Sequence, residues 1–133
     1  MDCPNCGGET VAFPAEGELA DRLTLPEDRS GGALCARCLA FAPVADPPAD
    51  LPDFREISDA FPADPDDAAL VAAVVALADS PAHYRAELDA LVADAERAGV
   101  DLFLTLDRLA DDPDLDPHLD LRRRSDQIEQ LLR

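Results

Sequence analysis

The chain has 133 residues, of which 29 are Asp or Glu and 11 are Arg, so its formal net charge is −18. A hydrophobic fraction of 47% excludes an acidic disordered chain, and no uncharged apolar run reaches the roughly 18 residues that span a bilayer. Abundant Asp without any Lys is typical of proteins adapted to molar salt. We therefore expect a halophilic, cytoplasmic protein with no membrane partner.

The N-terminal segment, residues 1–46, is predicted to be a zinc ribbon made of short antiparallel strands. Each of two cysteine pairs is followed by a segment with strand character. The expected elements are a strand over ETVAFP, a helical turn over residues 19–23, a glycine pair at Gly31 and Gly32 that returns the chain, and a strand over LAFAPV. The overall fold class is thus predicted to be α+β, with the ribbon preceding a small helical bundle.

The two cysteine pairs have the spacing of metal ligands. Cys3 and Cys6 lie in CPNCGG, Cys35 and Cys38 lie in CARC, and 28 residues separate the pairs. Two facing CxxC turns place four thiolates at the corners of a tetrahedron, which suits one Zn²⁺ with Zn–S bonds of about 2.3 Å. Four protein ligands leave no position for water, so we expect a structural zinc. A redox dithiol and another metal such as iron are the alternatives.

A linker and a helical domain are predicted to follow the ribbon. Residues 47–63 are rich in Pro and Asp and are predicted to form the linker, and we expect Phe54, Ile57 and Phe61 to anchor it against the helices. Residues 64–133 form the helical bundle, because the connections between helices are short. The expected helices cover residues 65–79, 81–98, 101–110 and 117–132, and start at Asp64-Pro65, Ser80-Pro81, Asp101 and Asp116-Pro117.

Three further groups of polar residues have weaker functional signals. Asp112, Asp114 and Asp116 resemble the ligands of a calcium loop, but the required glycine and glutamate are missing, so a capped turn is favoured. The two histidines, His83 and His118, have no metal-ligand spacing and are expected at the surface. The basic run Arg122, Arg123 and Arg124 is expected to pair with nearby carboxylates such as Asp120 and Asp126, a phosphate or partner contact being the alternative.

The cysteine turns, the acidic Lys-free composition and the tail DRLADDPDLDPHLDLRRRSDQIEQLL resemble a family of small haloarchaeal zinc-ribbon proteins. The resemblance covers nearly the whole chain and implies a ribbon followed by helices. Of the site residues it carries over only Cys3, Cys6, Cys35 and Cys38, and it implies no activity.

The sequence contains no catalytic motif, and we expect a protein without enzymatic activity. The favoured function is a protein-binding adaptor or regulatory module in which zinc fixes the ribbon. The alternative is a nucleic-acid-binding regulator, in which Arg37 of the second cysteine turn would contact the nucleic acid. A broad basic face is missing, although screening at ~1 M salt shortens the Debye length to about 3 Å and makes net charge a weak criterion.

Overall fold

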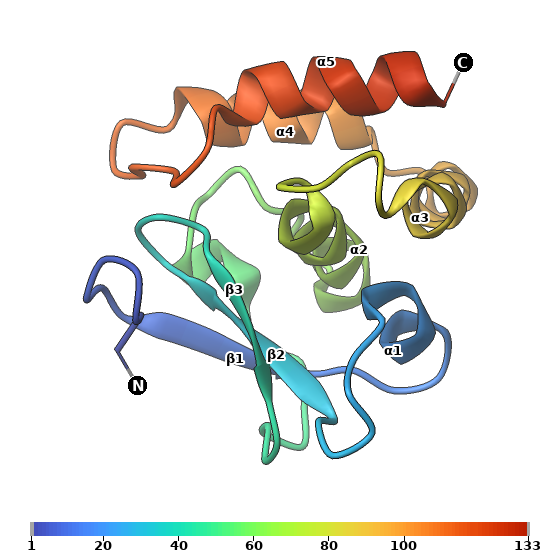
Figure 1. Ribbon diagram of the computed structural model, residues 1–133. Coiled ribbons are helices and arrows are strands. Elements are labelled where there is room, and N and C mark those ends of the chain that lie inside the picture. The colour runs from blue at the N-terminus through green and yellow to red at the C-terminus, as the bar shows by residue number, and fades with distance from the viewer. Residues whose placement is uncertain (1, 133) are drawn as a thin grey trace.

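The computed structural model describes residues 2–132 and confirms the α+β class (Figure 1). A three-stranded antiparallel sheet of order β1-β2-β3 lies at the N-terminus, and helices follow it. The elements are β1 (Thr10–Pro14), α1 (Glu18–Leu23), β2 (Gly31–Cys35), β3 (Phe41–Val44), the 3-10 helix η1 (Phe54–Glu56), α2 (Pro65–Leu77), α3 (Arg85–Ala98), α4 (Leu102–Asp111) and α5 (Leu121–Leu131). None of the helices among the described residues has the length and apolarity needed to cross a membrane.

The central strand β2 was not predicted, because Gly31 and Gly32 were interpreted as the end of a loop. Both glycines are buried within the strand, and Gly32 pairs with Phe13 of β1. A Cβ at Gly31 would lie 2.4 Å from the Phe13 carbonyl oxygen, and one at Gly32 would lie 2.2 Å from the Phe41 ring. Gly32 therefore makes room for the aromatic rings of the neighbouring strands, and Gly31 makes room for the β1 backbone and the Pro47 side chain. This close packing replaces the β-branched pattern that usually marks a strand.

Helix α2 lies in the middle of the molecule, between the sheet and the pair α4 and α5 (Figure 1). Eight of its 13 residues are buried, so the helix is apolar on nearly all sides rather than on one face. The expected anchors Phe54, Ile57 and Phe61 are also buried. The Phe54 ring meets the Phe13 ring edge-on at 5.4 Å and stacks on the Phe61 ring at 5.7 Å. These rings join the sheet, the linker and the helices in one hydrophobic core.

Two of the four predicted helix starts are confirmed. The Asp64 carboxylate accepts hydrogen bonds from the N–H groups of Asp66 and Asp67, and Pro65 is the first residue of α2. The Asp101 carboxylate accepts from the Leu104 N–H at 3.2 Å and begins α4. The left-handed Gly99, with φ of 77°, ends α3 as expected.

The other two helix starts were predicted wrongly. Helix α3 begins at Arg85 and not at Pro81, because the chain first makes a turn that the Tyr84 N–H closes on the Ser80 carbonyl at 3.1 Å. Helix α5 begins at Leu121 and not at Pro117, and its N-cap is Asp120. The Asp120 carboxylate accepts a hydrogen bond from the Arg123 N–H and so caps the helix at this point, while the residues just before it form hydrogen bonds with the second cysteine turn.

Candidate metal centre

Each cysteine pair lies in a tight turn, here called a knuckle: residues 3–8 form the first and residues 35–40 the second. In the first, the Cys3 N–H donates to the Gly8 carbonyl at 2.7 Å and the Gly7 N–H donates to the Cys3 carbonyl at 2.8 Å. In the second, the corresponding bonds join Cys35 to Ala40 at 3.0 Å and Leu39 to Cys35 at 3.1 Å. The two knuckles thus have the same backbone frame, related by a shift of 32 positions along the sequence.

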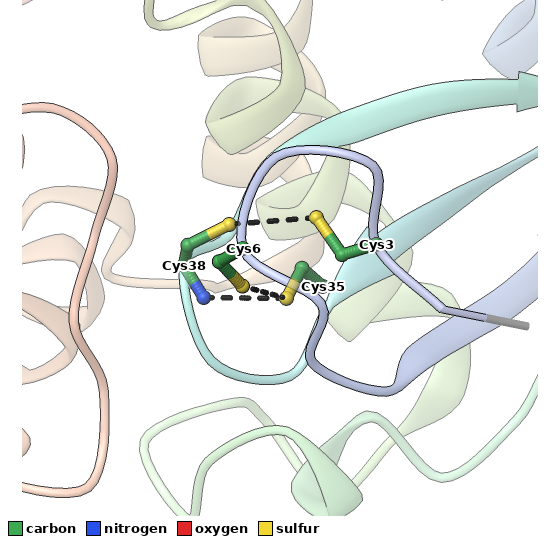
Figure 2. Close-up of side chains that lie close together, drawn as sticks. All are labelled: Cys3, Cys6, Cys35 and Cys38. Atoms are coloured by element: carbon green, nitrogen blue, oxygen red, sulfur yellow. Dashed lines mark hydrogen bonds between the residues drawn. The ribbon is translucent and has the colours of Figure 1, made fainter.

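The frame brings the four sulfur atoms together between the knuckles (Figure 2). The Cys3 and Cys38 sulfurs are 3.7 Å apart, the Cys6 and Cys35 sulfurs are 3.4 Å apart, and all four lie within 4.8 Å of one another. A tetrahedron with Zn–S bonds of about 2.3 Å has S···S edges of about 3.8 Å. The four thiols therefore fit one tetrahedral metal ion, and the predicted ligands form one cluster.

Backbone N–H groups point at the sulfurs, as they do where a thiolate must be stabilised. Asn5 N–H lies 3.4 Å from the Cys3 sulfur, and Arg37 N–H lies 3.4 Å from the Cys35 sulfur. Gly8 N–H lies 3.4 Å from the Cys6 sulfur. In each knuckle, the N–H group two residues after the first cysteine thus points at the sulfur of that cysteine. These N–H donors reduce the energetic cost of placing several thiolates close together.

Burial and these hydrogen bonds shift two thiol pKa values in opposite directions. Burial opposes ionisation of Cys3, but N–H groups of Cys6 and Asn5 and the neighbouring thiols outweigh it and lower its pKa from 9.0 to about 7. Burial dominates at Cys38 and raises the pKa of that thiol to about 12, although Asn5 and Ala40 lower it. A divalent cation would supply the charge that burial of a Cys38 thiolate requires.

The Asn5 side chain is a contact that sequence reasoning missed. Its Nδ2 group lies 3.5 Å from the Cys38 sulfur, so the first knuckle reaches across to a ligand of the second. Arg37 holds the equivalent position in the second knuckle, and its side chain is exposed. The polar residue inside CPNC was the only available signal for this contact.

The connection between α4 and α5 lies against the second knuckle, which sequence reasoning also missed. The Asp116 N–H donates to the Arg37 carbonyl at 2.7 Å, and the His118 N–H donates to the Cys38 carbonyl at 2.9 Å. This connection, residues 112–120, is here called the knuckle-binding loop. It ties the metal centre to the helical half of the chain.

Two aspartates of this loop act as a turn former and a helix cap, Asp112 and Asp120. Asp112 accepts a hydrogen bond from the Ser58 hydroxyl at 2.5 Å and another from the Asp114 N–H at 2.8 Å. These bonds match the favoured interpretation of a capped turn. Both histidines are exposed, as expected, and His83 lies edge-on to the Tyr84 ring at 4.7 Å.

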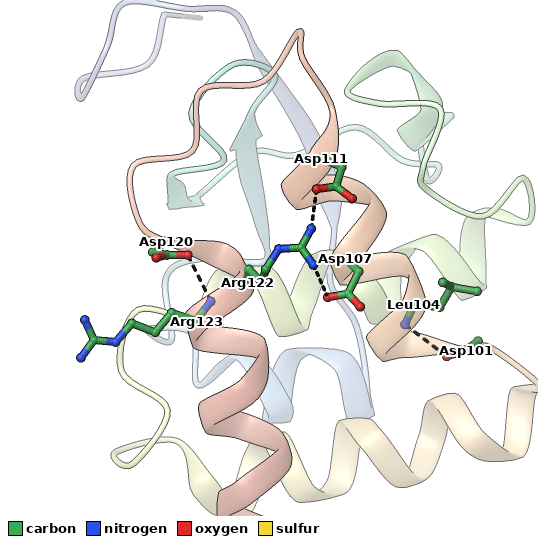
Figure 3. A network of polar contacts seen from close by, with 7 residues as sticks. All are labelled: Asp101, Leu104, Asp107, Asp111, Asp120, Arg122 and Arg123. Atoms are coloured by element: carbon green, nitrogen blue, oxygen red, sulfur yellow. Dashed lines mark hydrogen bonds and ion pairs between the residues drawn. The ribbon is translucent and has the colours of Figure 1, made fainter.

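Within the arginine run Arg122 pairs with carboxylates as expected, but with carboxylates of α4 rather than with Asp120 (Figure 3). Arg122 forms ion pairs with Asp107 and Asp111 of α4, and hydrogen bonding to Asp111 raises the pKa of its guanidinium group. Asp120 instead accepts a hydrogen bond from the Arg123 backbone N–H at 3.1 Å. The run therefore joins α5 to α4 through Arg122. Packing of the two helices brings Asp107 and Asp111 to the Arg122 side chain, although Asp120 is nearer in the sequence.

The family model of a family of unknown function (DUF6276) matches residues 2–132. The chain belongs to this family, which covers both the cysteine cluster and all the helices. Comparisons with curated proteins and with solved structures give no match.

Proposed function

We propose that the chain is a non-catalytic module in which one structural Zn²⁺ fixes the ribbon, and that the folded surface binds another protein. The observation that carries the proposal is the closed set of four sulfurs, all within 4.8 Å of one another. Zinc with four cysteine ligands has no open position for water or substrate, so such a site contributes folding free energy rather than chemistry.

The metal part of the proposal is tested by elemental mass spectrometry and thiol counting on protein purified in molar salt. One zinc per chain, with four thiols protected until a chelator is added, is the expected result. Protein without metal whose thiols cycle between oxidised and reduced forms would contradict it and favour the redox alternative.

Surface charge supports a protein partner over a nucleic acid. Many arginine side chains are already neutralised by Asp, in ion pairs that include Arg29–Asp28, Arg55–Asp53 and Arg122–Asp111. With a net charge of −18, few cations remain to displace counterions from a phosphate backbone.

The partner is tested by affinity purification in molar salt, followed by reconstitution of the complex from purified components. We expect one protein at fixed stoichiometry, and we expect Cys6→Ser, which removes one ligand, to abolish the complex. A bait that retains no stoichiometric protein, or one whose complex survives loss of the metal unchanged, would contradict the proposal.

A nucleic-acid regulator is the second candidate, and Arg37 is the residue that favours it. Its side chain is exposed on the second knuckle, where no described residue pairs with it. Binding to single- or double-stranded nucleic acid that is lost in Arg37→Ala but kept in Arg85→Ala would support this candidate. Equal binding by both variants would remove it.

A further inference from the structure

A cleft of about 630 Å³ lies among α1, α2 and α3, and linker residues 49–51 complete its wall. It begins at Pro14, the end of β1 opposite the cysteine cluster. Its size falls within the range of about 300–1,000 Å³ that is usual for sites of small molecules. The half-buried side chains of Leu19 and Leu70 supply an apolar wall.

Arg22 of α1 lines this cleft with unused hydrogen-bond donors. Its side chain is 28% exposed, and its Nε atom is buried without a hydrogen-bond partner. Nε forms an ion pair at 3.6 Å with one carboxylate oxygen of Asp94 in α3, and the other oxygen of Asp94 binds Arg97. A guanidinium group has five N–H donors, and those of Arg22 form no hydrogen bond with a described residue that would keep them from a ligand in the cleft. A ligand carboxylate would accept two of them in a bidentate pair.

Carboxylates line the rest of the cleft. Asp66 and Asp67 come from the first turn of α2, and Asp50 comes from the linker. None of the three forms an ion pair with a described residue, whereas Asp94 at the other side has two arginine partners. Burial raises the pKa of the Asp67 carboxyl, and the nearby charges of Asp64 and Asp66 raise it further. A cation at this wall would offset the repulsion among these groups.

From these two walls we infer that the cleft binds a basic α-amino acid, such as L-arginine or L-lysine. The carboxylate of the ligand would accept hydrogen bonds from Arg22, and its side-chain cation would lie against Asp66 and Asp67. The aliphatic part of the ligand would cover Leu19 and Leu70. This site is separate from the metal centre and does not depend on the proposed adaptor function.

Isothermal titration calorimetry on the full metal-loaded chain tests the inference, with L-arginine and with agmatine, which lacks the carboxylate. We expect L-arginine to bind about tenfold more tightly or better, since a hydrogen bond to a charged group contributes that much. In Arg22→Leu the two affinities should become equal. In the double variant Asp66→Asn and Asp67→Asn both ligands should weaken, whereas L-glutamate should not bind the wild type.

The control is a double variant with the same loss of charge outside the cleft, Asp46→Asn and Asp89→Asn, both at exposed positions. It should bind L-arginine as the wild type does, and circular dichroism should show every variant folded. Equal binding of L-arginine and agmatine by the wild type, an equal loss in the control, or no binding at all would overturn the inference.

Discussion

The two knuckles have the same hydrogen-bond frame but different surroundings. In the first knuckle Cys6 is exposed, as are Pro4, Asn5 and Gly7 between and beside the ligands. In the second, both cysteines are at most 3% exposed, and the knuckle-binding loop covers two of its carbonyl groups. The comparison teaches that, among the described residues, the second turn has contacts with the hydrophobic core and with the helical half of the chain that the first turn lacks.

The left-handed position of each knuckle shows the same difference. The first has Gly7 there, with φ of 79° and no atom within 4 Å of a would-be Cβ. The second has Leu39, with φ of 63° and a side chain only 2% exposed. A non-glycine residue in this conformation costs about 1–2 kcal/mol, whereas burying a leucine side chain contributes about 1.5–3 kcal/mol. Packing of the Leu39 side chain in the core offsets the backbone strain at this residue. Gly7 in the first knuckle has no such strain and no such packing.

Metal removal should produce the largest difference between the two knuckles. Zinc binding to sites of this class is worth on the order of 10 kcal/mol, so chelation should unfold residues 2–9. Hydrogen exchange followed by mass spectrometry should show lost protection there and a smaller loss in residues 35–40. Helical circular dichroism should persist, because α2 and its neighbours have their own core. Simultaneous loss of the helices would contradict the asymmetry.

Leu39→Ala should give the next largest effect, about 2–4 kcal/mol of unfolding free energy, because it removes a buried side chain and keeps the strained φ. Leu39→Gly should be less destabilising than Leu39→Ala, the reverse of the usual order, because glycine relieves the strain. The matched change in the first knuckle, Gly7→Ala, should cost about 1 kcal/mol. Urea denaturation of the metal-loaded protein measures all three. Equal costs at positions 7 and 39 would contradict the role assigned to the core.

Local sequence signals predicted much of the fold and the four cysteines that form the cluster. The CxxC turns, the two outer strands and the start of α2 each depend on residues close together in the chain. The central strand escaped prediction because its glycines are explained by residues distant in the sequence, namely Phe13 and Phe41 on the neighbouring strands and Pro47 after β3. The division into domains ending at residue 46 and starting at residue 64 stays a prediction.

What the sequence could not reveal depends on contacts between distant segments. The loop before α5 forms hydrogen bonds with the second knuckle, about 80 residues earlier in the chain. Arg122 pairs with Asp107 and Asp111 only because α4 and α5 pack together. The cleft around Arg22 is likewise assembled from the linker and three helices.

The side chains within the two CxxC turns provide a finer comparison. Asn5→Ala should lower zinc affinity about tenfold, because it removes the Nδ2 contact to the Cys38 sulfur and leaves the backbone N–H in place. Arg37→Ala makes the matched change in the second knuckle and should leave the affinity unchanged. Competition with a chromogenic chelator measures both. A similar loss in the two variants would mean that the side-chain contact has no special role.

Ser58→Ala should produce the smallest effect and test the link between the second knuckle and the helices. It removes the hydroxyl that donates to Asp112 at 2.5 Å, a bond worth about 1 kcal/mol. Faster hydrogen exchange is expected at Asp116 and His118, whose N–H groups bind the second knuckle, and unchanged exchange at Cys3 and Gly7 of the first.

A second hydroxyl serves as the control for this last measurement. Thr105 Oγ1 donates to the Asp101 carbonyl within α4 at 2.8 Å, away from the knuckle-binding loop. Thr105→Val should therefore leave exchange at Asp116 and His118 unchanged, although it also removes a partly buried hydrogen bond. If both variants speed exchange in the loop equally, the effect reflects global stability. If only Ser58→Ala does, the loop couples the helical half specifically to the second knuckle and not to the first.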